Sequence, residues 1–93
     1  MSIFKVSDTI RRTETVDGGI LLDVHHGQIF CMNVVGAKVL ELLGQGYDER
    51  YIADEISRDY GTDGEIVRAD VTEFIETLLN HHIIQPLRIG NVT

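Results

Sequence analysis

The chain has 93 residues, of which 43% are hydrophobic and 25% are charged. This length and composition are typical of one globular domain with a modest core, so we expect a single domain over residues 1–93. Eight Lys and Arg residues against fifteen Asp and Glu residues give a net charge of −7. That charge argues against binding to nucleic acid or to an anionic membrane. With one cysteine, no signal-peptide pattern and no membrane-spanning run, the chain is expected to be cytoplasmic.

The first third of the chain has the alternating pattern of β-strands. Strands are predicted at residues 10–14, 20–24 and 28–32, with a turn at residues 17–19 and another at Gly27. The second strand places its apolar side chains at period two on one face, namely Ile20, Leu22 and Val24. The simplest arrangement is an antiparallel meander in chain order, which leaves one edge of the third strand unpaired.

From residue 33 onward the apolar spacing becomes helical. Asn33, Asp48 and Asp63 are favoured N-cap residues, and they predict three helices that end near Gly44, Gly61 and residue 81. Residues 83–84 are expected to return to the core, residues 1–8 have no clear pattern, and residues 86–93 form a loose tail beyond a core of about 9–85. The predicted fold class is α+β, a small winged helix-turn-helix-like domain with a three-stranded antiparallel sheet followed by three helices.

Candidate catalytic and metal-binding residues are few. Cys31 has no evident general base, and the adjacent histidines at 25–26 and 81–82 point in different directions, so neither pair chelates a metal. Residues 59–70 resemble a calcium loop but place Gly61 where a ligand is needed. We therefore expect no enzymatic activity, no metal and no cofactor.

The predicted third helix argues against DNA binding. Between residues 63 and 82 there are five acidic residues and a single arginine, a net charge of −4 that would repel phosphates. A winged-helix module for protein–protein contacts, or a transcription-associated domain, remains the alternative function at this point.

The third predicted strand is a candidate binding edge. Residues 29–32 are apolar on both faces and contain neither Pro nor Lys, the residues that usually protect such an edge. An open edge accepts an extended partner by strand addition. Coverage of the edge by a helix, by the N-terminal segment or by a second copy of the chain is the alternative, and a homodimer is therefore also left open.

Several segments together resemble the PqqD-like family. They are Leu21-Leu22-Asp23, then residues 27–30 and 32–43, which match the family's strand-to-helix signature. The resemblance covers roughly residues 19–85, and its distinctive part is the step from Asn33 to Gly36 with the helix that follows. Val34-Val35 depart from the common Pro-Thr, which affects the loops and the choice of peptide more than the fold.

The resemblance implies a precursor-peptide recognition domain for ribosomally synthesised, post-translationally modified peptides. In that family the leader segment adds as a strand beside the third strand and packs on the third helix. A separate enzyme then receives it, such as a radical S-adenosylmethionine enzyme in pyrroloquinoline quinone assembly or a leader peptidase in lasso-peptide pathways. Carried onto this chain, the expected peptide-binding residues are Gln28, Ile29, Phe30, Cys31 and Met32 on the strand and Arg68, Val71, Thr72, Ile75 and Leu79 on the helix.

Two further expectations concern the predicted third helix. Arg68 is expected either to meet an acidic leader side chain or to pair with Glu65 at the surface. Val67, Phe74 and Leu78 are expected to serve the core instead of the peptide groove.

Overall fold

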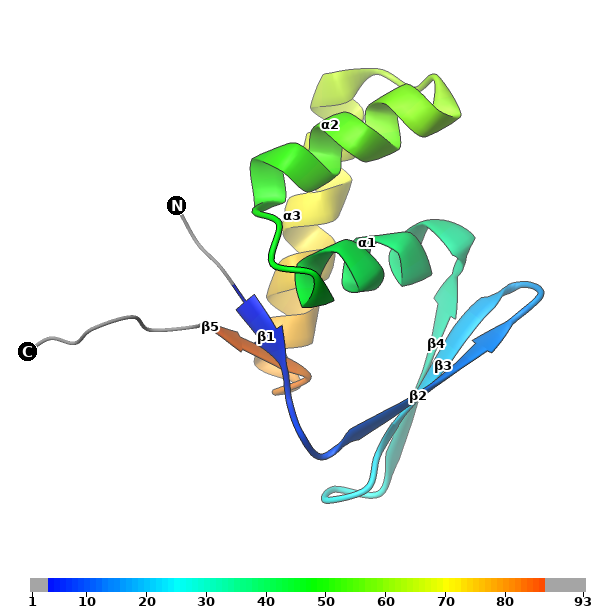
Figure 1. Cartoon of the computed structure of the whole chain (residues 1–93), viewed down its shortest axis with the longest axis vertical. Coiled ribbons are helices and arrows are strands. Elements are labelled where there is room, and N and C mark those ends of the chain that lie inside the picture. Colours follow the sequence, from blue (N-terminus) through cyan, green and yellow to red (C-terminus); the bar gives the residue numbers. More distant parts are fainter. Residues whose placement is uncertain (1–3, 87–93) are drawn as a thin grey trace, which may run out of the picture.

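The computed structural model describes residues 4–86, in which an antiparallel sheet is followed by three helices (Figure 1). The sheet has the order β2-β3-β4, with the strands β2 (Ile10–Thr15), β3 (Gly18–Asp23) and β4 (Gln28–Asn33). The helices are α1 (Val34–Gly44), α2 (Glu49–Tyr60) and α3 (Gly64–Asn80). A separate two-stranded antiparallel sheet pairs β1 (Phe4–Val6) with β5 (Ile84–Pro86).

The α+β class, the strand order and the three helices agree with the sequence-based prediction, whereas β1 and β5 were not predicted. Each has three residues, too few for a periodic pattern, and they pair across almost the whole chain. Phe4 and Ile84 are buried, so this small sheet closes the core below α1 and α3. The loose tail was expected to begin at residue 86, but Pro86 belongs to β5; residues 87–93 lie outside the described residues. Within residues 4–86, no helix is long and apolar enough to cross a membrane.

The turn between β2 and β3 differs from the prediction. It consists of Val16 and Asp17, while Gly18 and Gly19 belong to β3. Gly18 has a φ of 143°, and a Cβ built on it would lie 2.1 Å from the backbone oxygen of Met32. The glycine is therefore required by the close approach of β4 and not by the turn itself.

The sheet packs on the helices through one face only. Leu21 and Asp23 are fully buried on that face, whereas Ile20, Leu22 and Val24 are 39%, 38% and 50% exposed. The alternation that predicted one shared face for these three residues was right, but the face they share is the outer one. Leu21 pairs with Phe30 on the neighbouring strand, and both side chains point toward the helices.

Each helix begins at the N-cap residue that was predicted. The side-chain oxygens of Asn33, Asp48 and Asp63 each accept a backbone hydrogen bond of 2.8 Å from the first turn of their helix. Gly61 ends α2 with a φ of 61°, as expected for a left-handed C-cap. Because α1 follows β4 without an intervening loop, the start of α1 lies directly at the end of β4.

Candidate functional site

One edge of β4 is open in the described structure. The other edge pairs with β3 in an unbroken register from Gly18 opposite Asn33 to Asp23 opposite Gln28. Within residues 4–86 no strand pairs with the free edge, as the meander order predicted. Ile29 is 67% exposed and Cys31 is also exposed; they pair with Leu22 and Ile20, so both side chains lie on the outer face of the sheet. Residues 29–32 include neither Pro nor Lys, so within the described residues the free edge of β4 is apolar and unprotected.

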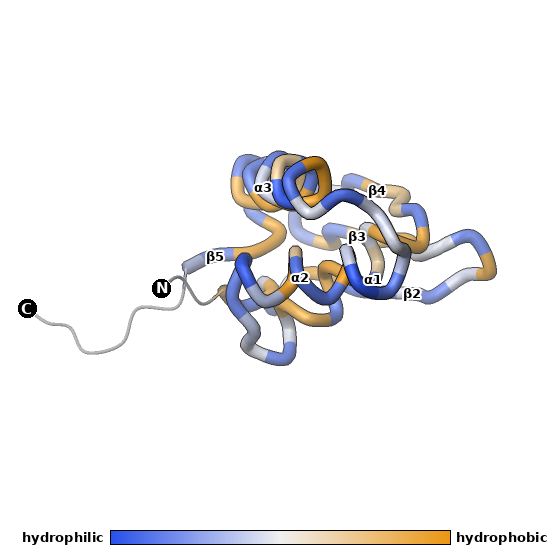
Figure 2. The backbone as a smooth tube through the Cα atoms, turned by 90° about the horizontal axis from the view of Figure 1, so that it is seen from above, coloured by the Kyte–Doolittle hydropathy of each residue, from blue (hydrophilic) through white to orange (hydrophobic). Residues whose placement is uncertain are grey.

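A pocket of about 680 Å³ lies beside this edge. Seen from above, α3 and β4 lie on the same side of the molecule (Figure 2). Residues of both elements line the pocket. The start of α1 and the end of α2 complete the lining. The residues that line it on the strand and on α1 are Cys31, Met32, Asn33, Val35, Gly36 and Val39. Those on the other two helices include Ile56, Tyr60, Val67, Asp70, Val71, Glu73, Phe74 and Thr77.

An aromatic contact joins β4 to the end of α3. The rings of Phe30 on β4 and His81 after α3 have centroids 4.9 Å apart, and neither residue lines the pocket. The strand contributes to the pocket from Cys31 onward, so the pocket occupies the C-terminal half of the predicted strand wall. Gln28 and Ile29 lie beyond the Phe30–His81 contact, toward the β3–β4 turn.

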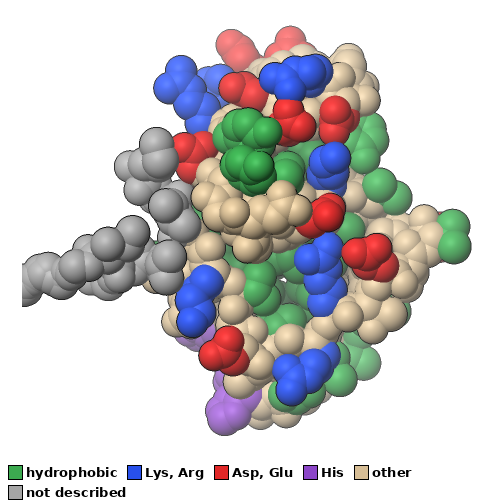
Figure 3. All heavy atoms as spheres, in the orientation of Figure 1, with side chains coloured by type: hydrophobic (Ala, Val, Ile, Leu, Met, Phe, Trp, Pro, Cys, Tyr) green, Lys and Arg blue, Asp and Glu red, His purple; other side chains and the backbone are tan. Residues whose placement is uncertain are grey.

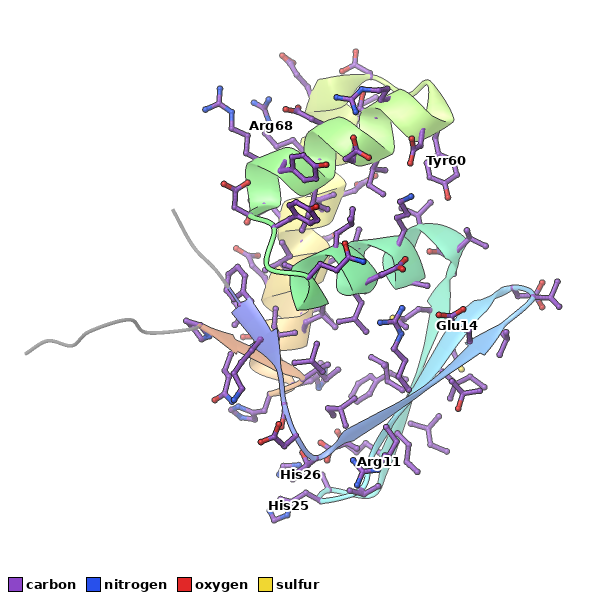
Figure 4. All side chains as sticks on the ribbon, viewed as in Figure 1. Arg11, Glu14, His25, His26, Tyr60 and Arg68 are labelled. Atoms are coloured by element: carbon purple, nitrogen blue, oxygen red, sulfur yellow. The ribbon has the colours of Figure 1, made fainter. Side chains whose placement is uncertain are left out.

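The α3 residues predicted to line the groove lie around several sides of the helix. Val71 lines the pocket, but Ile75 is buried in the core and Leu79 is half-buried against it. Thr72 donates a hydrogen bond of 2.6 Å to Glu49 of α2. Arg68 is exposed and lies on the side of the helices opposite to Tyr60 (Figure 4). In the described part of the chain, Arg68 forms no ion pair with Glu65.

The structure brings other α3 residues to the pocket. Val67 and Leu78 are buried in the core, as expected, and Val67 also lines the pocket. Phe74 is half-buried against the core and lines the pocket, and its Cζ would lie 3.3 Å from a Cβ built on Gly36. Phe74 therefore packs closely over the first turn of α1, where a Cβ at residue 36 would require its ring to shift by a few tenths of an ångström. The apolar stripe of α3 was visible in the sequence, but the side of it that faces β4 depends on how the helix is rotated in the fold.

An ion pair joins two walls of the pocket. Lys38 Nζ of α1 lies 3.1 Å from Asp59 Oδ2 of α2, one residue before Tyr60. The hydrogen bond and the charge of Asp59 raise the pKa of Lys38 above its usual 10.5, so the lysine remains charged at neutral pH. Because Asp59 has this partner and Asp63 caps α3, the calcium-loop pattern of the sequence has a structural explanation.

Asp23 organises the turn that leads into β4. Its carboxylate accepts backbone hydrogen bonds from His25 and His26, at 3.0 and 3.1 Å, and lies 2.8 Å from Nδ1 of the His26 ring (Figure 4). Burial raises the pKa of Asp23, but the hydrogen bonds and charge of His26 outweigh it, so the pKa lies below its usual 3.8. The ionised form of Asp23 thus holds the hairpin of the open strand in register.

Replacing Asp23 by Asn is expected to lower the melting temperature at pH 7 by several degrees. The pKa of Asp23 is lower in the folded state than in the unfolded state. The carboxylate therefore stabilises the fold fully above the unfolded-state pKa, and this stabilisation is lost as the pH falls through the folded-state pKa. The difference between wild type and variant should therefore shrink below about pH 4 when thermal unfolding is followed by circular dichroism. Asp17→Asn, the same change in the exposed β2–β3 turn, serves as the control. A deficit that is independent of pH would contradict this role.

The fold and the open edge beside the pocket define a small α+β domain built to receive an extended chain. The family model for Coenzyme PQQ synthesis protein D (PqqD) matches residues 18–84 of this sequence. The chain belongs to the PqqD family, as its strand-to-helix signature predicted. No curated protein matches the sequence.

Three solved structures share this fold. TbiB1 in complex with the TbiA(beta) leader peptide is 27% identical, with a TM-score of 0.80 over 96% of this chain and 99% of that one. Lasso peptide synthetase B1 complexed with its leader peptide is 20% identical, with a TM-score of 0.81 over 89% of this chain and 98% of that one. The PqqD truncation of Methylobacterium extorquens PqqCD, described as a functional and stand-alone recognition element, is 18% identical, with a TM-score of 0.73 over 89% and 88%.

Proposed function

We propose that this domain captures the leader segment of a ribosomally synthesised precursor peptide. The leader adds as a strand to the free edge of β4 and places side chains in the pocket between β4 and α3. The observation that carries the proposal is the unpaired, apolar edge of β4 directly beside this pocket. A solved structure with 27% identity, TbiB1, holds a leader peptide.

Strand addition explains the roles of both the free edge of β4 and the pocket beside it. Main-chain hydrogen bonds to β4 supply affinity for any extended peptide, and alternate side chains that enter the pocket supply specificity. The volume of about 680 Å³ lies within the range of about 300–1,000 Å³ that ligand pockets usually have. A micromolar affinity, about −8 kcal/mol, is reasonable for one added strand with a few apolar anchors.

The domain acts without breaking or making bonds. By holding the leader beside a maturation enzyme, it raises the effective concentration of the peptide at that enzyme. The partner is a separate cytoplasmic enzyme, for which a radical S-adenosylmethionine enzyme and a leader peptidase are the two candidates. Pairing of two copies through β4 would compete with the leader, because one edge accepts one strand.

Selection of peptides from a random display library on the immobilised chain tests this function. We expect enriched peptides that bind in solution and slow the alkylation of Cys31, which is exposed and lines the pocket. Scrambled versions of the same peptides control for non-specific binding. A winged-helix module for contacts with folded proteins would enrich no peptide, and that result, or unchanged alkylation of Cys31, would overturn the proposal.

A further inference from the structure

Among the described residues, the charged side chains that line the pocket are all acidic. They are Asp70 and Glu73, both on α3, and no Lys, Arg or His of residues 4–86 lines the pocket. Neither carboxylate forms an ion pair within this part of the chain, whereas Asp59 and Glu55 nearby are each paired with a basic residue. Residues 4–86 therefore leave two negative charges uncompensated at the rim of the pocket.

The basic side chains of the described chain are placed elsewhere. Lys38 and Arg58 are engaged by Asp59 and Glu55, and Arg12 pairs with Glu14 on the sheet. Arg68 lies on the side of the helices opposite to Tyr60, which lines the pocket (Figure 4). On the face shown in Figure 3, basic and acidic side chains are interspersed, so the charges there offset one another. In the pocket, by contrast, the charged lining residues of the described chain are acidic alone.

The interior of the pocket is apolar. Met32, Val39 and Val71 are buried, and Val35 and Phe74 are half-buried around the same space. This floor suits an aliphatic or aromatic side chain of a bound peptide, as the acidic rim suits a cation.

The acidic and the apolar lining residues are neighbours on α3. Asp70 is adjacent to Val71, and Glu73 is adjacent to Phe74, and all four line the pocket. Side chains two residues apart in a bound strand lie on the same face, about 6.6 Å from each other. A peptide with one side chain on the apolar floor therefore has other side chains close to the carboxylates.

We infer, on the basis of the proposed function, that the leader carries a Lys or Arg close to its apolar anchor, and that Asp70 and Glu73 select it. This is the opposite charge to the acidic leader side chain that the sequence suggested for Arg68. The carboxylates contribute specificity at an exposed rim, while the anchor and the strand hydrogen bonds contribute most of the affinity.

The test compares peptide selection on three forms of the chain from the same random library. Wild type is expected to enrich Lys or Arg at a position close to an aliphatic or aromatic one. The double variant D70N/E73Q should keep the anchor preference and lose the cationic one. The control E65Q/E76Q removes the same charge from α3 at exposed positions that do not line the pocket, and it should behave as wild type.

Affinities of the best wild-type peptide then measure the effect. We expect a loss of about five-fold for each carboxylate removed, and a salt dependence that is present in wild type and absent in the double variant. Anchored peptides without a cationic preference would overturn this inference and leave the proposed function standing. An equal loss in E65Q/E76Q would also overturn it, because net charge alone would then explain the effect. No enriched peptide on any form would overturn both.

Discussion

Replacement of Val35 by Gln is expected to weaken peptide binding about 10- to 100-fold while the domain stays folded. Val35 is half-buried in the first turn of α1 and lines the pocket beside Met32 and Val39. A bound apolar anchor would bury the Gln amide without a hydrogen-bond partner, at a cost of about 1–3 kcal/mol. The amide carries no charge, so the effect is independent of the acidic rim formed by Asp70 and Glu73.

Val34→Gln is the matched control for this change. Val34 is the neighbouring residue in the same helical turn, but it is 49% exposed and does not line the pocket. Both substitutions alter helix propensity in the same way. Titration calorimetry with a display-selected peptide should show near wild-type affinity for the Val34 variant. Equal losses in the two variants, or none in either, would mean that the peptide does not occupy this pocket.

Replacement of Leu21 by Ala is expected to destabilise the fold by about 3 kcal/mol. Leu21 has 0% of its surface exposed and lies on the face of β3 that packs against the helices. The truncation removes buried apolar surface and leaves a cavity between the sheet and α1. Urea unfolding followed by circular dichroism measures the loss as a shift of the midpoint with an unchanged slope.

The adjacent leucine tests the register of the same strand. Leu22 is 38% exposed on the outer face, so Leu22→Ala should cost less than about 1 kcal/mol. Comparable losses for Leu21 and Leu22 would show that the sheet does not bury the face described above, and the position of β4 relative to the pocket would change with it.

Local signals were sufficient to predict the three strands of the meander and the three helices. Asn33, Asp48 and Asp63 each have a side chain that satisfies free backbone amides, and each begins a helix. The left-handed conformation of Gly61 ends α2, and Gly27 turns the second hairpin with a φ of 66°. These interactions involve residues within one turn of each other, so their chemistry is visible in the sequence.

Features that depend on distant residues were harder to predict. The alternation around Leu21 and Leu22 is apolar on both faces, and only the position of the helices decides which face is buried. The pairing of β1 with β5 depends on the two ends of the described chain meeting. On α3, the rotation of the helix brings Asp70 and Phe74 to the pocket and turns Thr72 toward α2.

Residue-resolved amide hydrogen exchange, measured with and without a display-selected peptide, tests strand addition to β4 most directly. The sheet contains its own control, because β2 is the other edge strand of the same sheet and carries the charged residues Arg11, Arg12 and Glu14. We predict that bound peptide slows exchange at amides of Gln28–Asn33 and leaves the amides of Ile10–Thr15 unchanged. Unchanged exchange in β4, or slowed exchange in β2 instead, would contradict the account.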